Sequence, residues 1–174
     1  MLNPAYNNNW QQAREVLDEQ GFVLLGEVLA KETYEELLAQ LQAATYQESY
    51  EPALHRYQTT LVPQLVHEVL QEVSQQLHLQ TPTRTQLRKY SRGSYTLHDD
   101  DEEHAGVEYA LLASKDWEAS WRGEITYTHP DKQPLKVPVQ ANAILIIKRE
   151  AQTGMFVKRV THHATNEYYA AHSR

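Results

Sequence analysis

Residues 83–114 read TRTQLRKYSRGSYTLHDDDEEHAGVEYALLAS, and this stretch decides the fold class. It contains three short runs prone to β structure, 83–90, 94–98 and 107–114, separated by turn-forming and acidic residues. Runs of this length between Gly, Ser and Asp residues are typical of β-strands. Further runs of the same kind follow at regular spacing. The pattern therefore predicts eight short strands in a sandwich or small jelly-roll barrel. The later runs are 123–129, 135–139, 143–148, 155–163 and 168–173.

The first 80 residues predict three helices and one strand. The first helix follows the asparagines at 7–9, which are suited to cap it, and ends at Gly21. A strand is expected over 22–29, a second helix over 32–44, and a third from Pro63 onward, where apolar residues recur at helical spacing. The polar stretch 45–60 is interpreted as a connection. We expect one domain over 1–174, with a helical support region, 1–80, packed on a β core, 83–174.

Composition limits the classes of function. Of 174 residues, 41% are hydrophobic, and 16 Lys and Arg stand against 23 Asp and Glu, for a formal net charge of −7. That sign argues against nucleic acid or an anionic membrane as the main partner. The chain has no cysteine, which excludes disulfides, thiolate zinc sites and a thiol nucleophile. With no apolar targeting segment at the N-terminus and no run long enough to span a membrane, a cytoplasmic protein is expected.

Two His-x-Asp triplets are candidates for metal chemistry. On a strand, residues two apart point to the same face, so His98 and Asp100 would project together into a barrel mouth. With a distant histidine they would form the two-His, one-carboxylate face that suits iron(II) with open coordination positions. The second triplet, His129-Pro130-Asp131, lies in a predicted turn, where His and Asp side chains commonly only meet water and cap the turn, so it is the weaker candidate.

The motifs around His98 resemble those of the 2-oxoglutarate/iron(II)-dependent dioxygenases, in their prolyl-hydroxylase-like branch. The matching stretches keep their order along nearly the whole chain. They are Tyr90-x-x-Gly93-Ser94-Tyr95-x-x-His98-x-Asp100, YALL at 109–112, Trp117, WRGEI at 121–125 and ANAILI at 141–146, with GFVL at 21–24 near the start. The resemblance implies an α+β, mainly β fold: a double-stranded β-helix (jelly-roll, cupin-like) with N-terminal helices packed on one sheet. Arg122 stands where the family often has glycine.

The resemblance also implies a distal histidine as the third metal ligand. His163 is favoured because it lies eleven residues before Arg174 and is followed by alanine, as in the family's distal motif. His162 is the alternative, because it would share a strand face with Val160. A third alignment places Met155-x-Val157-x-x-Val160 on the family's H-x-V-x-x-V, and the site then lacks its third ligand.

Two residues are expected to hold the cosubstrate. Arg174 would pair with the far carboxylate of 2-oxoglutarate, since a guanidinium forms a bidentate pair with a carboxylate. Tyr90 would contribute its hydroxyl. Lys148 and Arg159 are weaker substitutes for Arg174.

The implied activity is hydroxylation of an unactivated C–H bond with Fe(II), 2-oxoglutarate and O2, and ascorbate as a candidate reductant. The substrate would be a protein side chain or a small molecule. Two alternatives stay open. One is a non-catalytic β-helix binding module without a complete metal site, and the other is a metal-dependent hydrolase or isomerase on a cupin-like barrel.

Overall fold

Three α-helices form where apolar residues recur at helical spacing. In this computed structural model, which describes residues 1–6, 9–59, 61–97 and 105–174, they are α1 (Trp10–Gln20), α2 (Lys31–Ala43) and α3 (Gln64–Gln76). Single 3-10 turns form at η1 (Pro4–Tyr6) and η2 (Ala119–Trp121). The predicted stop of α1 is confirmed, because Gly21 has a φ of 79° and its N–H donates to the carbonyl of Leu17.

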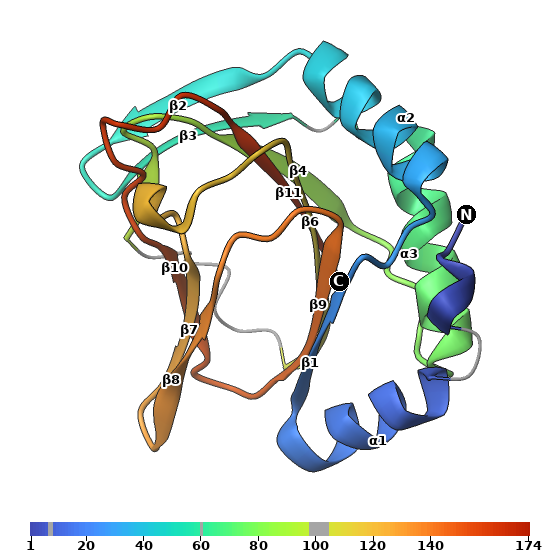
Figure 1. Cartoon of the computed structure of the whole chain (residues 1–174). Coiled ribbons are helices and arrows are strands. Elements are labelled where there is room, and N and C mark those ends of the chain that lie inside the picture. Colours follow the sequence, from blue (N-terminus) through green and yellow to red (C-terminus); the bar gives the residue numbers. More distant parts are fainter. Residues whose placement is uncertain (7–8, 60, 98–104) are drawn as a thin grey trace.

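The strands of the described residues join in one antiparallel, 11-stranded sheet, which curls into the half-barrel of Figure 1. Its order is β1-β9-β6-β11-β4-β3-β5-β10-β7-β8, with β2 paired to β3 alone. The strands in chain order are β1 (Phe22–Gly26), β2 (Gln47–Glu51), β3 (Leu54–Thr59), β4 (Thr85–Tyr90), β5 (Tyr95–Thr96), β6 (Gly106–Ser114), β7 (Ile125–His129), β8 (Lys132–Val137), β9 (Ala143–Arg149), β10 (Gly154–Val157) and β11 (Tyr168–Ser173). This architecture confirms the predicted mainly β jelly-roll fold.

Alternate residues of the central strands face two separate cores. On β6, Tyr109 and Leu111 point toward the helices, whereas Ala110 and Leu112 point into the barrel. The helices cover the outer face of the sheet, as predicted (Figure 1). Every second residue of β4, β6, β9, β10 and β11 therefore faces the barrel interior. This alternation decides which side chains can contribute to the candidate site.

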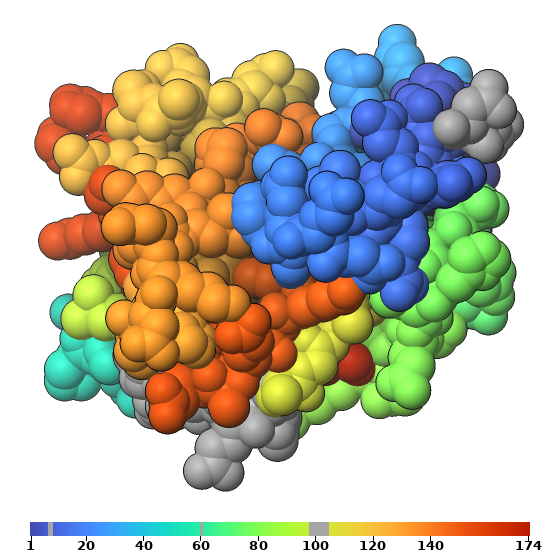
Figure 2. All heavy atoms as spheres, turned by 90° about the horizontal axis from the view of Figure 1, so that it is seen from below, coloured from blue at the N-terminus to red at the C-terminus, as the bar shows by residue number. Residues whose placement is uncertain are grey.

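The two ends of the sheet, β1 and β8, do not pair with each other in the described ladder. Figure 2 shows the segments around them, blue and orange, on the same face of the molecule. A cavity of about 180 Å³ lies between them, lined by Gln20–Phe22 on one side and by residues of β7 and β8 on the other.

The stretch 45–60 is not a simple connection, as we expected, but a hairpin of β2 and β3. Its side chains lack an apolar alternation because β2 is largely exposed, while β3 is held by main-chain pairing with β4 and β5. The helical support region therefore also contributes β1, β2 and β3 to the sheet. The predicted strand 22–29 ends early, at Gly26, because Glu27 takes a φ of 55°.

The predicted strand 155–163 is also shorter, since β10 ends at Val157. Beyond it, the N–H groups of Lys158, Val160 and Thr161 donate to the carbonyls of Glu124, Ser94 and Trp121 instead of continuing one ladder. None of the helices in the part of the chain that the structure describes is long and apolar enough to span a membrane.

Candidate functional site

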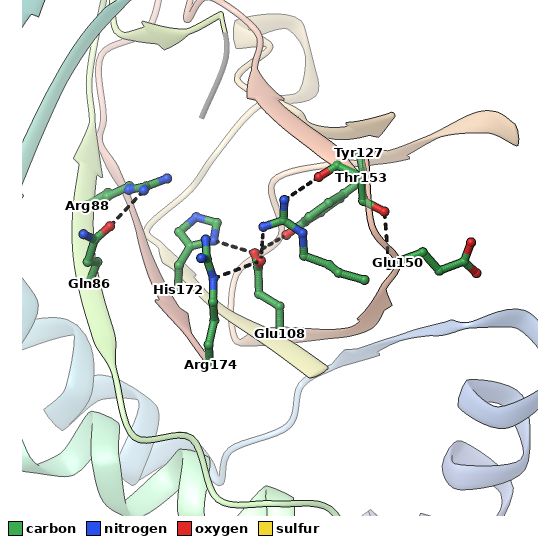
Figure 3. Close-up of polar contacts among 9 residues, drawn as sticks. Gln86, Arg88, Glu108, Tyr127, Glu150, Thr153, His172 and Arg174 are labelled. Carbon is green, nitrogen blue, oxygen red and sulfur yellow. Dashed lines mark hydrogen bonds and ion pairs between the residues drawn. The ribbon is translucent and has the colours of Figure 1, made fainter. Parts of the chain in front are cut away.

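The candidate site is a small polar cavity inside the barrel, between β4, β6, β10 and β11. Its volume of about 20 Å³ is enough for roughly one water molecule. Polar and charged side chains line it although they stand on strands that are otherwise apolar on this face (Figure 3). The lining residues are Arg84, Gln86, Arg88, Glu108, Met155, His172 and Arg174.

Glu108 lies at the centre of this cluster and is 1% exposed. One carboxylate oxygen, Oε2, accepts a hydrogen bond from Nη1 of Arg149 at 2.8 Å. The other, Oε1, accepts from the hydroxyl of Tyr127 at 2.8 Å and from Nδ1 of His172 at 3.3 Å. Nε of Arg174 lies 3.7 Å from Oε2. The strand order explains these contacts, because β6 lies between β9, which carries Arg149, and β11, which carries His172.

The surroundings of Glu108 keep its carboxylate ionised. Burial alone would raise its pKa, but the hydrogen bond from His172 and the charges of His172 and Arg149 outweigh burial and lower the pKa from 4.5 to about 2. The same carboxylate acts on Tyr127 in the opposite direction. Burial and the nearby Glu108 charge raise the pKa of Tyr127 well above 10, so it remains a neutral hydrogen-bond donor.

Arg149 completes the network. Its guanidinium is nearly fully buried and donates to the carbonyl of Thr153 as well as to Glu108. A buried carboxylate with this many donors is compatible with folding, because each partner offsets part of the cost of removing the charge from water. We call Glu108, Arg149, His172 and Tyr127 the interior network.

The first two predicted metal ligands, His98 and Asp100, lie outside the described residues, and their roles stay predictions. His162 and His163 are both exposed, in a turn beyond the end of β10, with ring centroids 3.8 Å apart. Our expectation that they lie on a strand is therefore wrong. The chain has already left the sheet at Lys158, so His162 does not share a strand face with Val160. The assignment of His163, made from its spacing to Arg174, stays a prediction.

Two residues of the third alignment, Met155 and Val157, lie on β10. On β10, Met155 and Val157 point into the barrel core, and Val157 pairs with Thr96 of β5, the strand that leads toward His98. Met155 is 2% exposed and lines the cavity beside the interior network. The side chain that β10 presents to the barrel is thus a thioether.

The two predicted cosubstrate residues, Arg174 and Tyr90, have different surroundings. Arg174 approaches Glu108 and is 23% exposed at its side chain. Tyr90 is fully buried and stacks on Tyr168, with centroids 4.9 Å apart and planes 15° from parallel. Of the substitutes, Lys148 forms an ion pair with Asp18 on the outer surface, and Arg159 is exposed. These positions do not test the binding of 2-oxoglutarate.

Of the three predicted iron(II) ligands, His98 and Asp100 lie outside the described residues, and His163 lies in an exposed turn. Among the described residues, no group of three or more His, Asp or Glu side chains is placed to hold a metal ion. The cavity beside Met155 has room for about one water, and Glu108 and His172 of the interior network line it. Tyr90 argues for a ligand in the barrel, because its buried hydroxyl has no hydrogen-bond partner among the described residues.

Sequence reasoning missed the interior network. The sequence nevertheless contains a sign of it. Glu108, Arg149 and His172 are each a charged or titratable residue at the end of an apolar run predicted to be a strand. A charged side chain on the inner face of a strand needs a partner on a neighbouring strand. The strand order, which the sequence does not contain, was needed to identify the partners.

No protein-family model and no curated protein sequence matches the chain. Its structure is similar to a Trichoplax adhaerens prolyl hydroxylase in complex with a hypoxia inducible factor peptide fragment, at a TM-score of 0.73 and 12% identity over 94% of this chain and 87% of that one. A Pseudomonas putida prolyl-4-hydroxylase gives 0.73 and 12% over 94% and 97%. An oxidoreductase of the 2OG-Fe(II) oxygenase family from Burkholderia pseudomallei gives 0.69 and 10% over 99% and 93%. The chain therefore has the fold of the prolyl hydroxylases and 2OG-Fe(II) oxygenases, which confirms the resemblance at the level of the fold.

Proposed function

We propose that this chain is a non-catalytic binding protein built on the dioxygenase fold. The observation that carries the proposal is the inward-facing residue of β10, the buried Met155, at the place where the resemblance expects a histidine ligand. A thioether is a soft ligand and a poor match for iron(II), which binds imidazole and carboxylate in such sites.

The interior network supports the same conclusion. The Glu108 carboxylate is held by Arg149, Tyr127 and His172, and its side chain and that of Arg149 are each 2% exposed. The cavity beside Met155, about 20 Å³, is too small for a five-carbon dicarboxylate, and the Glu108 and His172 side chains line it. Enlarging the cavity on that side would draw Glu108 away from its partners. Breaking a buried, hydrogen-bonded ion pair is strongly unfavourable, by about 3–5 kcal/mol. The network thus favours a closed barrel interior.

Anaerobic titration with iron(II) and 2-oxoglutarate tests the proposal, since a bound pair gives a charge-transfer absorption band in the visible range. We expect no band in the wild-type protein. Met155→His is the matched variant, because it places an imidazole at the inward position of β10, and it should bind iron(II) more tightly than the wild type. A saturable band in the wild-type protein would contradict the proposal.

The second candidate function is hydroxylation of an unactivated C–H bond with Fe(II), 2-oxoglutarate and O2. Tyr90 favours it, because a buried hydroxyl without a partner costs about 1–3 kcal/mol, and a cosubstrate oxygen would satisfy it. The peptide bound to the Trichoplax enzyme supports a protein side chain as the substrate, with a small molecule as the alternative.

Succinate formation from 2-oxoglutarate under air separates the two candidates. If the chain is a hydroxylase, the wild type forms succinate, Asp100→Ala abolishes its formation, and Tyr90→Phe weakens the apparent constant for 2-oxoglutarate. Ascorbate would then sustain turnover. If the chain is a binding protein, all three proteins are equally inactive.

A further inference from the structure

A strongly basic groove lies apart from the barrel cavity and shares none of its lining residues. Its volume is about 580 Å³, and it is lined by Arg92, Arg122, Arg159, Thr161, His162 and His163, together with Gly93 and Val160. No acidic side chain is present among the described residues that line it. We call Arg92, Arg122, Arg159, His162 and His163 the basic groove. Three arginines in one groove are unexpected on a chain whose net charge is −7.

Main-chain hydrogen bonds hold the three segments of the basic groove together. The turn after β4 is joined to the segment after β10, because Gly93 N–H donates to the carbonyl of Val160 and Val160 N–H to that of Ser94. The same segment is joined to η2, since Thr161 N–H donates to the carbonyl of Trp121 at 3.0 Å. All three segments lie at one end of the barrel (Figure 1). Their arginines therefore project from a fixed backbone, which reduces the entropy lost when a ligand binds.

Arg122 adopts a backbone conformation that favours glycine. Its φ is 62° and its ψ is −139°, and its carbonyl accepts a hydrogen bond from Nε1 of Trp117. A residue with a side chain is strained in this region, and such strain persists where the side chain has a use. Arg122 is exposed and packs no core, so stability gives no reason for the arginine. We therefore attribute the presence of arginine at this position to an interaction of its guanidinium group.

Thr161 provides a second polar group. Its hydroxyl is buried and has no hydrogen-bond partner among the described residues, although Thr161 lines the basic groove. The nearby cation Lys158 is already paired with Glu124, at 3.3 Å, and neither of these two lines the groove. None of the three arginines forms an ion pair with another described residue.

We propose that the basic groove binds a phosphate monoester. A phosphoryl group carries close to two negative charges and three acceptor oxygens at neutral pH, which matches several guanidinium forks and one free hydroxyl. A long polyanion is a poorer match, because the acidic remainder of the surface would repel the parts that extend beyond the groove. The proposal goes beyond the function of the barrel interior and does not depend on it.

Calorimetric titration with O-phospho-L-serine tests this proposal at physiological ionic strength. We expect one saturable site, weaker binding of inorganic phosphate, and still weaker binding of citrate. Tighter binding of citrate or of a short DNA duplex than of phosphoserine would overturn the proposal, as would the absence of phosphoserine binding.

Three variants separate a binding role from a structural one. Arg159→Gln should weaken phosphoserine binding about tenfold, as loss of a charge-assisted contact predicts. Arg122→Gly should weaken it similarly while raising the melting temperature by about 2 °C or more, because glycine relieves the strain. The exposed Lys136→Gln on β8 is the charge-matched control and should leave the affinity within about twofold. Unchanged affinity in Arg159→Gln and Arg122→Gly would overturn the proposal.

Discussion

Replacing Glu108 by glutamine perturbs the interior network with the smallest change in shape. The variant keeps an oxygen that can accept from Tyr127 but loses the charge that balances Arg149, which is 2% exposed at its side chain. The new amide N–H groups would also face the donors of Arg149 and His172. A buried guanidinium would then lack its counter-ion, which is among the most unfavourable changes in a protein interior.

The size of the loss follows from the pKa of Glu108 in the folded protein. Burial raises that pKa, but His172 and Arg149 together lower it from 4.5 to about 2. At about 1.4 kcal/mol per pKa unit, the ionised carboxylate contributes about 3 kcal/mol of stability at neutral pH. Removing one partner of a buried ion pair typically costs about 3–5 kcal/mol, and the two values agree. Because the folded pKa is the lower one, this contribution is complete above pH 4.5 and is lost as the pH falls toward 2.

Equilibrium unfolding in urea measures this loss directly. At neutral pH, Glu108→Gln should lower the unfolding free energy by about 3–5 kcal/mol, and the difference from wild type should shrink as the pH falls from about 4.5 to about 2. The exposed Glu19→Gln on α1 is the matched control and should change stability by less than about 0.5 kcal/mol. A Glu108→Gln protein within about 1 kcal/mol of wild type, with a constant difference across this pH range, would refute the reasoning.

Three further predictions concern the same barrel and use the same unfolding assay. The double variant Glu108→Leu, Arg149→Met removes both charges together. It should recover most of the stability lost in Glu108→Gln, because a buried ion pair can be replaced by apolar groups at little cost. A double variant less stable than Glu108→Gln would contradict this. Gly123→Ala should destabilise by at least about 2 kcal/mol, since φ is 84° and the added Cβ would lie 3.0 Å from Cε1 of Tyr168; stability equal to wild type would show that the neighbours adjust freely. Tyr168→Phe should cost about 1–2 kcal/mol, because its hydroxyl donates to the carbonyl of Gly123 at 2.8 Å inside the core, and an unchanged free energy would remove that hydrogen bond from the account.

Local pattern predicted the helices and most strands because their residues alternate or recur with a clear period. The end of α1 at Gly21 and the run that forms β6 required no tertiary information. The hairpin of β2 and β3 was missed because an exposed edge strand needs no apolar alternation. The sequence pattern predicted strand β10 too long. The N–H groups that follow it donate to carbonyls of segments that are distant in the sequence.

The candidate site was predictable only in part. The alignment that places Met155 at the ligand position was found from the sequence, but the inward direction of Met155 became visible only with the register of β10. The interior network could not be derived, because Glu108, Arg149 and His172 are brought together by the order β9-β6-β11 rather than by spacing along the chain. The basic groove has the same origin, since three separate turns contribute its arginines.

Anomalous diffraction at the iron edge tests the central claim most directly, using crystals grown anaerobically with iron(II) and 2-oxoglutarate. If Met155 and the interior network close the barrel, the map will show no ordered iron in the barrel, and Arg149 will still contact Glu108. An iron peak inside the barrel held by His98 and Asp100, with 2-oxoglutarate beside it and the contact between Glu108 and Arg149 broken, would contradict the account.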